Sequence, residues 1–117
     1  MESLDKALLC MKIIDERKAI DPVLLDVEKM TSITDYFIVT GGNSSRQVQA
    51  ISRHVARKMR ECGVRPNGIE GEHEGHWVLM DYGDVVIHIF YQPVREFYDL
   101  EGLWAEAPRV EINAEKS

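Results

Sequence analysis

Residues 68–104 read GIEGEHEGHWVLMDYGDVVIHIFYQPVREFYDLEGLW, and this stretch decides the fold. The runs 77–81 and 85–91 are rich in β-branched and aromatic residues, which favour strands. Tyr82-Gly83-Asp84 between them is short enough for the tight turn of a hairpin. The stretch therefore predicts two antiparallel neighbouring strands, with Ile69 in a shorter strand before them.

After the hairpin, the pattern changes from strand to helix. Pro93 cannot donate a backbone hydrogen bond, so it ends the second strand. A helical stripe of large apolar residues follows, at Phe97, Leu100, Leu103 and Trp104. We expect a short final helix there, and a weakly ordered tail over residues 105–117.

The N-terminal part of the chain predicts a helix and two strands. Apolar residues at helical spacing indicate a helix over residues 4–19, with Ser3 as its N-cap. Asp21-Pro22 then forces the chain out of helix, because the residue before a proline disfavours the helical conformation. The β-rich runs 23–27 and 36–40 are expected to be neighbouring strands.

The middle of the chain predicts the longest helix. Ser44 followed three residues later by Gln47 is a capping-box pattern, and Gly63 is a natural C-terminal stop. The apolar face of this helix consists of Val48, Ile51, Val55 and Met59. The full order of elements predicts an α/β fold, in which a mixed sheet is flanked by helices, in one domain over residues 1–104.

Composition and charge limit the class of partner. The chain has 117 residues, of which 44% are hydrophobic, and its 20 acidic and 14 basic residues give a net charge of −6. Dominant binding to nucleic-acid phosphate is not expected, because it depends on clustered Lys and Arg. A basic protein partner fits the sign better, with RNA as a minor contact. The basic residues of the long helix, Arg46, Arg53, Arg57, Lys58 and Arg60, are expected to be its solvated side.

The cellular compartment is indicated by the cysteines and by the N-terminus. Cys10 and Cys62 both fall in predicted helices and are too few for a disulfide-stapled scaffold. The start MESLDKALLCMK lacks a signal-peptide pattern, and no run approaches the roughly 18 apolar residues of a membrane span. A cytoplasmic protein is expected, although an organellar protein without its transit peptide would show the same sequence.

Two motifs suggest ligand chemistry, and each has a structural explanation. Gly41-Gly42-Asn43-Ser44-Ser45 lies between a strand and a helix, where backbone N–H groups can bind phosphate. It lacks the Lys-Ser/Thr of a P-loop, and N-capping by Ser44 accounts for its residue types. The ligand-type residues Glu72, His73, Glu74 and His76 lie between glycines with no cysteine nearby, so a solvated loop is favoured over a metal site.

The strand 77–81 is apolar on both faces. A central strand buried on both sides would explain this pattern, but Trp is rarely fully buried and is common at binding hot spots. We therefore expect Trp77 or its neighbours to contact a partner, and His88 to be a hydrogen-bonded core or edge histidine rather than a catalytic base. Alternation places Trp77, Leu79 and Asp81 opposite Val78, Met80 and Tyr82, and either face could be the exposed one.

Four separated motifs, in order, resemble the ribosomal silencing factor family, also called the RsfS or Iojap-related family. They are SITDYFIVTGGNSSRQ (32–47), GIEG (68–71), HWVLMDYGDVVIHIF (76–90) and YDLEGLW (98–104). The resemblance spans roughly residues 4–104 and implies a distant relation to the nucleotidyltransferase fold. The strand starting at Asp84 has no second alternating carboxylate, so metal-dependent transfer is not expected.

The resemblance implies a translation repressor that is not an enzyme and uses no cofactor or metal. Members of this family bind the universal ribosomal protein number fourteen of the large subunit and block joining of the small subunit, especially in nutrient limitation. The interface positions carried over to this sequence are Trp77, Leu79, Met80, Asp81, Tyr82 and Tyr91. A monomer or weak homodimer is expected.

Two other functions stay open at this point. The first is a nucleotide-binding or nucleotidyltransferase-like enzyme that would use residues 41–45 together with Asp84. The second is a dimeric adaptor in which the Trp77 strand pairs with its own copy.

Overall fold

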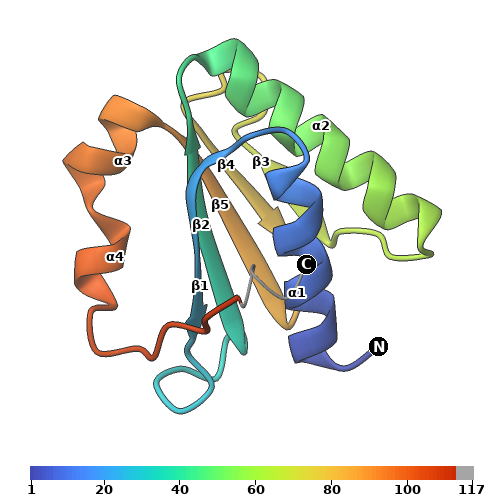
Figure 1. The fold of residues 1–117 in the computed structure, drawn as a ribbon, viewed down its shortest axis with the longest axis vertical. Coiled ribbons are helices and arrows are strands. Elements are labelled where there is room, and N and C mark those ends of the chain that lie inside the picture. Colours follow the sequence, from blue (N-terminus) through green and yellow to red (C-terminus); the bar gives the residue numbers. More distant parts are fainter. Residues whose placement is uncertain (113–117) are drawn as a thin grey trace.

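The computed structural model describes residues 1–112 and shows a five-stranded sheet with helices on both faces (Figure 1). The strand order is β1-β2-β5-β4-β3, and within residues 1–112 only the β2–β5 pair is parallel. The predicted mixed sheet flanked by helices is therefore confirmed. The elements are α1 (Ser3–Asp15), β1 (Ile20–Asp26), β2 (Tyr36–Gly42), α2 (Ser45–Glu61), β3 (Gly68–Glu70), β4 (Trp77–Asp81), β5 (Val85–Tyr91), α3 (Gln92–Tyr98) and α4 (Leu100–Leu103).

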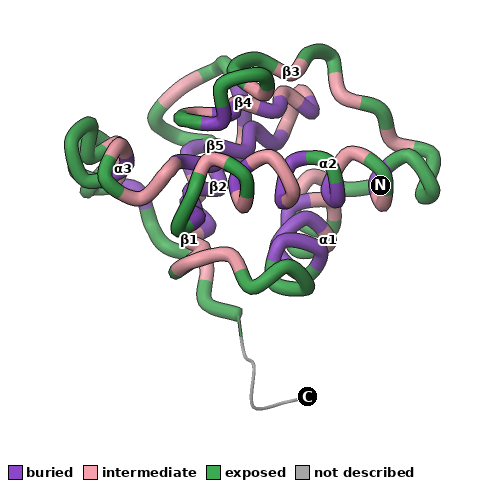
Figure 2. Tube along the Cα trace, turned by 90° about the horizontal axis from the view of Figure 1, so that it is seen from above, coloured by how far each residue is buried: buried purple, intermediate pink, exposed green. Residues whose placement is uncertain are grey.

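The main core lies between the sheet and helices α1 and α2. Figure 2 shows the buried positions gathered on the strands and on these two helices, whereas α3 is mostly exposed. The predicted apolar face of α2 is confirmed, since Val48, Ile51, Val55 and Met59 are all fully buried. On the sheet, alternate residues of β4 and β5 point into this core, at Val78, Met80, Ile87 and Ile89.

The predicted boundaries of α2 are also confirmed. The Ser44 Oγ atom accepts the Gln47 backbone N–H at 3.1 Å, which caps the helix. The Gln47 Oε1 atom accepts the N–H of Asn43, one residue before the cap. Gly63 has a φ of 81° just after the helix, in the left-handed region that favours glycine. Cys62 lies just outside the helix and is exposed, whereas Cys10 is buried inside α1 and burial raises its pKa to about 12.

The first helix differs from the sequence prediction at both ends. Ser3 does not cap it, because its Oγ donates to Asp35 Oδ2 at 2.8 Å. The helix ends at Asp15 rather than at residue 19, and the chain turns through Lys18 with a φ of 56°. The strand then begins at Ile20, which pairs with Gly41, and an irregularity in register accommodates Asp21-Pro22.

The C-terminal region corrects two predictions. The single final helix is two short helices, because Asp99 adopts a φ of 46° between them and its side chain caps α4. Phe97 and Leu103 are 80% and 76% exposed, whereas Trp104 is half-buried and packs against the small cluster of Leu25, Val27 and Ala107.

The tail expected to be weakly ordered is in part paired with β1. The Asp26 N–H donates to the carbonyl of Pro108, and the Val110 N–H donates to the carbonyl of Leu24, each at 2.8 Å. These backbone bonds carry no side-chain signal, so the sequence does not reveal them. Residues 113–117 lie outside the described part of the chain. Over residues 1–112, no helix has the length and apolarity that a membrane crossing needs.

Candidate protein-binding site

The face of the sheet turned away from α1 and α2 is rich in aromatic residues. Helices α3 and α4 lie on this side and cover only part of it (Figure 1). We call this surface the outer sheet face. It consists of Phe37 from β2, Trp77 and Leu79 from β4, and Val86, His88 and Phe90 from β5.

The structure resolves which side of β4 is accessible. Trp77, Leu79 and Asp81 share the outer side, and all three are half-buried. Met80 is fully buried and Tyr82 is 4% exposed, both in the core under α1 and α2. The side chains of Met80 and Tyr82 therefore present almost no surface to a partner in this structure, and contact by either of them stays a prediction.

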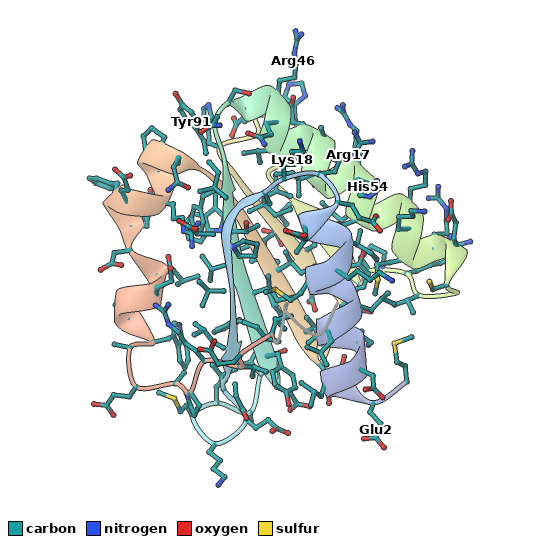
Figure 3. All side chains as sticks on the ribbon, in the orientation of Figure 1. Glu2, Arg17, Lys18, Arg46, His54 and Tyr91 are labelled. Carbon is teal, nitrogen blue, oxygen red and sulfur yellow. The ribbon has the colours of Figure 1, made fainter. Side chains whose placement is uncertain are left out.

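Tyr91 lies apart from the three accessible residues of β4. It is half-buried at the last position of β5 and packs against the main core. Its side chain lies at the end of the sheet where α2 begins (Figure 3). Because Phe90 before it belongs to the outer sheet face, Tyr91 points to the other side of the sheet.

Trp77 is held among aromatic rings with one edge hydrogen-bonded. Its ring centroid lies 4.8 Å from that of Phe90 and 5.0 Å from that of Tyr98. Its indole N–H donates to His88 Nδ1 at 3.1 Å. A large side chain fixed in this way loses little further conformational entropy when it binds a partner.

His88 is a buried, hydrogen-bonded histidine of the outer sheet face, in keeping with the predicted core or edge histidine. It is 6% exposed, and burial lowers its pKa from 6.5 to about 4, so the ring is neutral at physiological pH. Since Nδ1 accepts from Trp77, the proton lies on Nε2, which has no hydrogen-bond partner within residues 1–112. This arrangement suits orientation of Trp77 and not proton transfer.

An apolar groove of about 380 Å³ runs beside Trp77. Its other lining residues are His76 and, from α3, Pro93, Val94, Phe97 and Tyr98. Phe97 and Tyr98 are 80% and 51% exposed, and large exposed aromatic side chains gathered in one place mark interaction sites. The sequence placed Phe97 in an apolar helical stripe, a pattern that does not tell an exposed side chain from a buried one.

The loop before Trp77 is anchored to α2. The Gln49 side-chain amide donates to the carbonyls of Glu72 and His73, at 3.1 and 2.8 Å. Gly75 has a φ of 72°, and a Cβ there would lie 2.7 Å from the Ser45 carbonyl oxygen. The backbone of this loop is therefore preorganised, although His73 and Glu74 are exposed as expected. The described residues contain no group of three or more His, Cys, Asp or Glu side chains placed to hold a metal ion.

The two parts of the suggested nucleotide site lie at opposite ends of the sheet. Strands β2 and β5 are parallel, with Tyr36 beside Val85 at one end and Gly42 beside Tyr91 at the other. The turn 41–45 follows one end and Asp84 precedes the other, which separates them by about 20 Å of strand. Asp84 is already paired with Lys6 Nζ at 2.6 Å.

Several known proteins are similar to this chain in sequence, in fold or in both. The family model described as "Ribosomal silencing factor during starvation" matches residues 1–117. The "Ribosomal silencing factor RsfS" of Bacillus subtilis is 41% identical over 99 residues, which cover 85% of this chain and 84% of that protein. The protein of the same name from Chromobacterium violaceum is 39% identical over 117 residues, covering 99% and 96%. A crystal structure of a Chromobacterium violaceum protein matches with a TM-score of 0.87 at 41% identity, covering 90% of this chain and 88% of that one. This chain therefore belongs to the ribosomal silencing factor family.

Proposed function

We propose that this protein represses translation by binding the large ribosomal subunit and sterically blocking the small subunit from joining, especially in nutrient limitation. Family membership supports the association with the ribosome. The observation that carries the proposal is the half-exposed Trp77, fixed by His88, Phe90 and Tyr98 on a sheet face that α3 and α4 leave partly open.

The proposed docking surface is the accessible part of the outer sheet face together with the groove beside it. Trp77 and Leu79 supply apolar area, and Asp81 supplies a half-exposed carboxylate at the rim. An aromatic anchor surrounded by polar residues is the usual anatomy of a binding hot spot. Apart from His76, the residues of this surface come from strands and from α3, which hold them more rigidly than loops would.

The proposed partner is the universal ribosomal protein number fourteen, in keeping with the resemblance noted in the sequence. The net charge of −6 favours a basic protein over nucleic acid as the main partner. Asp81 accepts the Gly83 N–H through Oδ1 at 2.8 Å, and its carboxylate has further acceptor sites for a basic side chain.

The proposed mechanism is exclusion without a chemical step. The Cα positions extend 33 × 32 × 32 Å, so a bound molecule would occupy a substantial part of any surface between subunits. The separation of residues 41–45 from Asp84 supports this mechanism over the enzyme alternative, which would need both at one site.

A charge placed on the outer sheet face tests the proposal. We expect Leu79→Glu to abolish co-migration with purified large subunits in a sucrose gradient and to restore subunit joining, because it puts a second carboxylate inside the apolar contact. Ile33→Glu is the matched control, since Ile33 is 81% exposed in the loop between β1 and β2. Equal loss in both variants, or normal binding by a folded Leu79→Glu protein, would remove the docking surface from this face.

A further inference from the structure

We infer that the solvent side of α2 is a second interaction surface, which binds the phosphate backbone of RNA. Its members are Arg46, Arg53, Arg57 and Arg60, and we call them the arginine stripe. The stripe points away from the sheet, whereas the proposed docking surface lies on the far face of the sheet. The inference therefore goes beyond the proposed function and does not depend on the contacts of Trp77.

The four arginines form one continuous row. Their spacings of seven, four and three residues bring each side chain back to the same side of a helix with 3.6 residues per turn. All four are exposed, and the row is about 21 Å long at a rise of 1.5 Å per residue. An elongated row of cations fits a repeating chain of phosphates better than it fits one small anion.

The charge of α2 is opposite to that of the whole chain. Ser45–Glu61 holds five basic residues and one acidic residue, although the net charge of the protein is −6. Arg53 and Arg57 are four residues apart, a spacing at which like charges destabilise a helix. If this helix face served only solubility, alternating acidic and basic side chains would stabilise the helix better. The concentration of basic side chains on α2 therefore indicates an anionic partner.

The guanidinium groups are largely free to bind. Within residues 1–112, no carboxylate lies within ion-pair distance of Arg46, Arg53 or Arg60. Arg57 donates to His54 Nδ1 at 3.1 Å, and His54 in turn bonds to Glu16. Four arginines and no lysine in the row also favour phosphate, because the planar guanidinium can donate two parallel hydrogen bonds to it.

Further basic residues widen the surface near the start of α2. The Gln47 side chain donates to the Lys18 carbonyl at 3.4 Å, which brings the turn after α1 beside this helix. Arg17 and Lys18 are exposed in that turn, which lies beside the N-terminal half of α2 (Figure 3). A membrane surface is disfavoured as the partner, because none of the exposed large apolar residues belongs to α2.

The test compares two variants that lose the same charge. The stripe variant is Arg46→Gln/Arg53→Gln/Arg60→Gln, which keeps Arg57 because it bonds to His54. The control is Lys12→Gln/Lys29→Gln/Arg65→Gln, at three exposed positions outside the row. The probe is a labelled RNA duplex of about 16 base pairs, titrated by fluorescence anisotropy from about 50 to 200 mM salt.

We expect the wild-type protein to bind the duplex with a dissociation constant of about 10⁻⁴ M or tighter at the lowest salt. For the wild type, a plot of the logarithm of affinity against the logarithm of salt concentration should have a slope of about −3. The stripe variant should bind at least about tenfold more weakly, and its affinity should depend much less on salt. The control variant and Leu79→Glu should bind RNA like the wild type. Equal losses in the stripe and control variants would overturn the inference. The inference would also be overturned if the wild-type protein bound polyglutamate or anionic phosphatidylserine vesicles as tightly as it binds RNA. It would be overturned as well if the wild-type protein did not bind the duplex.

Discussion

Replacing Trp77 with Ala separates a docking residue from a purely structural one. The ring contacts Phe90 and Tyr98 and donates to His88, so its loss also affects the fold. Truncating a buried aromatic residue costs about 3–5 kcal/mol, and Trp77 is only half-buried, so we expect a loss of about 2–3 kcal/mol in the free energy of unfolding. In a domain of this size, that corresponds to a fall in Tm on the order of 10 °C.

The same change should weaken docking by more than the fall in stability can explain. A hot-spot aromatic residue contributes about 2–4 kcal/mol to binding, and each 1.4 kcal/mol is tenfold in affinity, so the dissociation constant should rise about 30- to several-hundred-fold. Both quantities are measured on one preparation, with thermal unfolding by circular dichroism and binding by sedimentation with large subunits. Binding is measured well below the Tm of the variant, so that the folded fraction stays near one.

Trp77→Phe is the matched control for the ring contacts. It keeps an aromatic side chain between Phe90 and Tyr98 but removes the indole N–H, which leaves His88 Nδ1 buried without its donor. We expect an unfolding cost of about 1–3 kcal/mol but a smaller loss of binding than with Ala. If Trp77→Ala melts earlier and yet binds and blocks joining normally, Trp77 is a packing residue and docking belongs to another face.

Three further predictions follow from other parts of the structure. The pKa of His88 is about 4 in the folded state and 6.5 in the unfolded state, so between these pH values the unfolded state binds more protons. The free energy of unfolding should therefore fall by about 3 kcal/mol as the pH drops from 6.5 to 4. Urea titrations should show that the stability of His88→Phe depends less steeply on pH than that of the wild type. A Gly75→Ala protein should keep its secondary structure but bind large subunits more weakly, because a Cβ there would push the loop before Trp77 away from Ser45. Unchanged co-sedimentation with large subunits would show that the loop can shift without loss of binding. Calorimetry with ATP, GTP and CTP in magnesium should show nothing tighter than millimolar, and a micromolar constant abolished by Gly42→Val would revive the enzyme alternative.

The elements governed by local periodicity could be predicted from the sequence. Examples are the apolar face of α2, its Ser44 cap and the β4–β5 hairpin, each of which depends on residues that lie close together in the sequence. The α3–α4 region was mispredicted because a helical stripe gives no sign that Asp99 breaks the helix in a left-handed conformation. Strand order, and the pairing of residues 108–110 with β1, depend on contacts between distant backbone groups that leave no pattern in the sequence.

The candidate site could be predicted in position but not in orientation. Alternation divides β4 into Trp77, Leu79 and Asp81 against Val78 and Met80, and both groups include large apolar residues. The packing of α1 and α2 decides which group is buried, and that information lies outside the strand. The sequence therefore predicted Met80 as an interface residue although its side chain is buried, and it did not point to the α3 residues that line the groove beside Trp77.

Helices cover the two faces of the sheet to different extents (Figure 1). The face under α1 and α2 is closed and supplies the main hydrophobic core, so stability does not depend on the outer sheet face being fully covered. That face can then leave Trp77 and Leu79 half-exposed, at a cost in apolar burial that the main core offsets. If one side docks through Trp77 while α2 carries its charge on the opposite side, mutations on the two surfaces should act additively on large-subunit binding, because they share no contact. A strong non-additive coupling between Trp77→Ala and the stripe variant would show instead that the two surfaces meet the same partner through a rearranged fold.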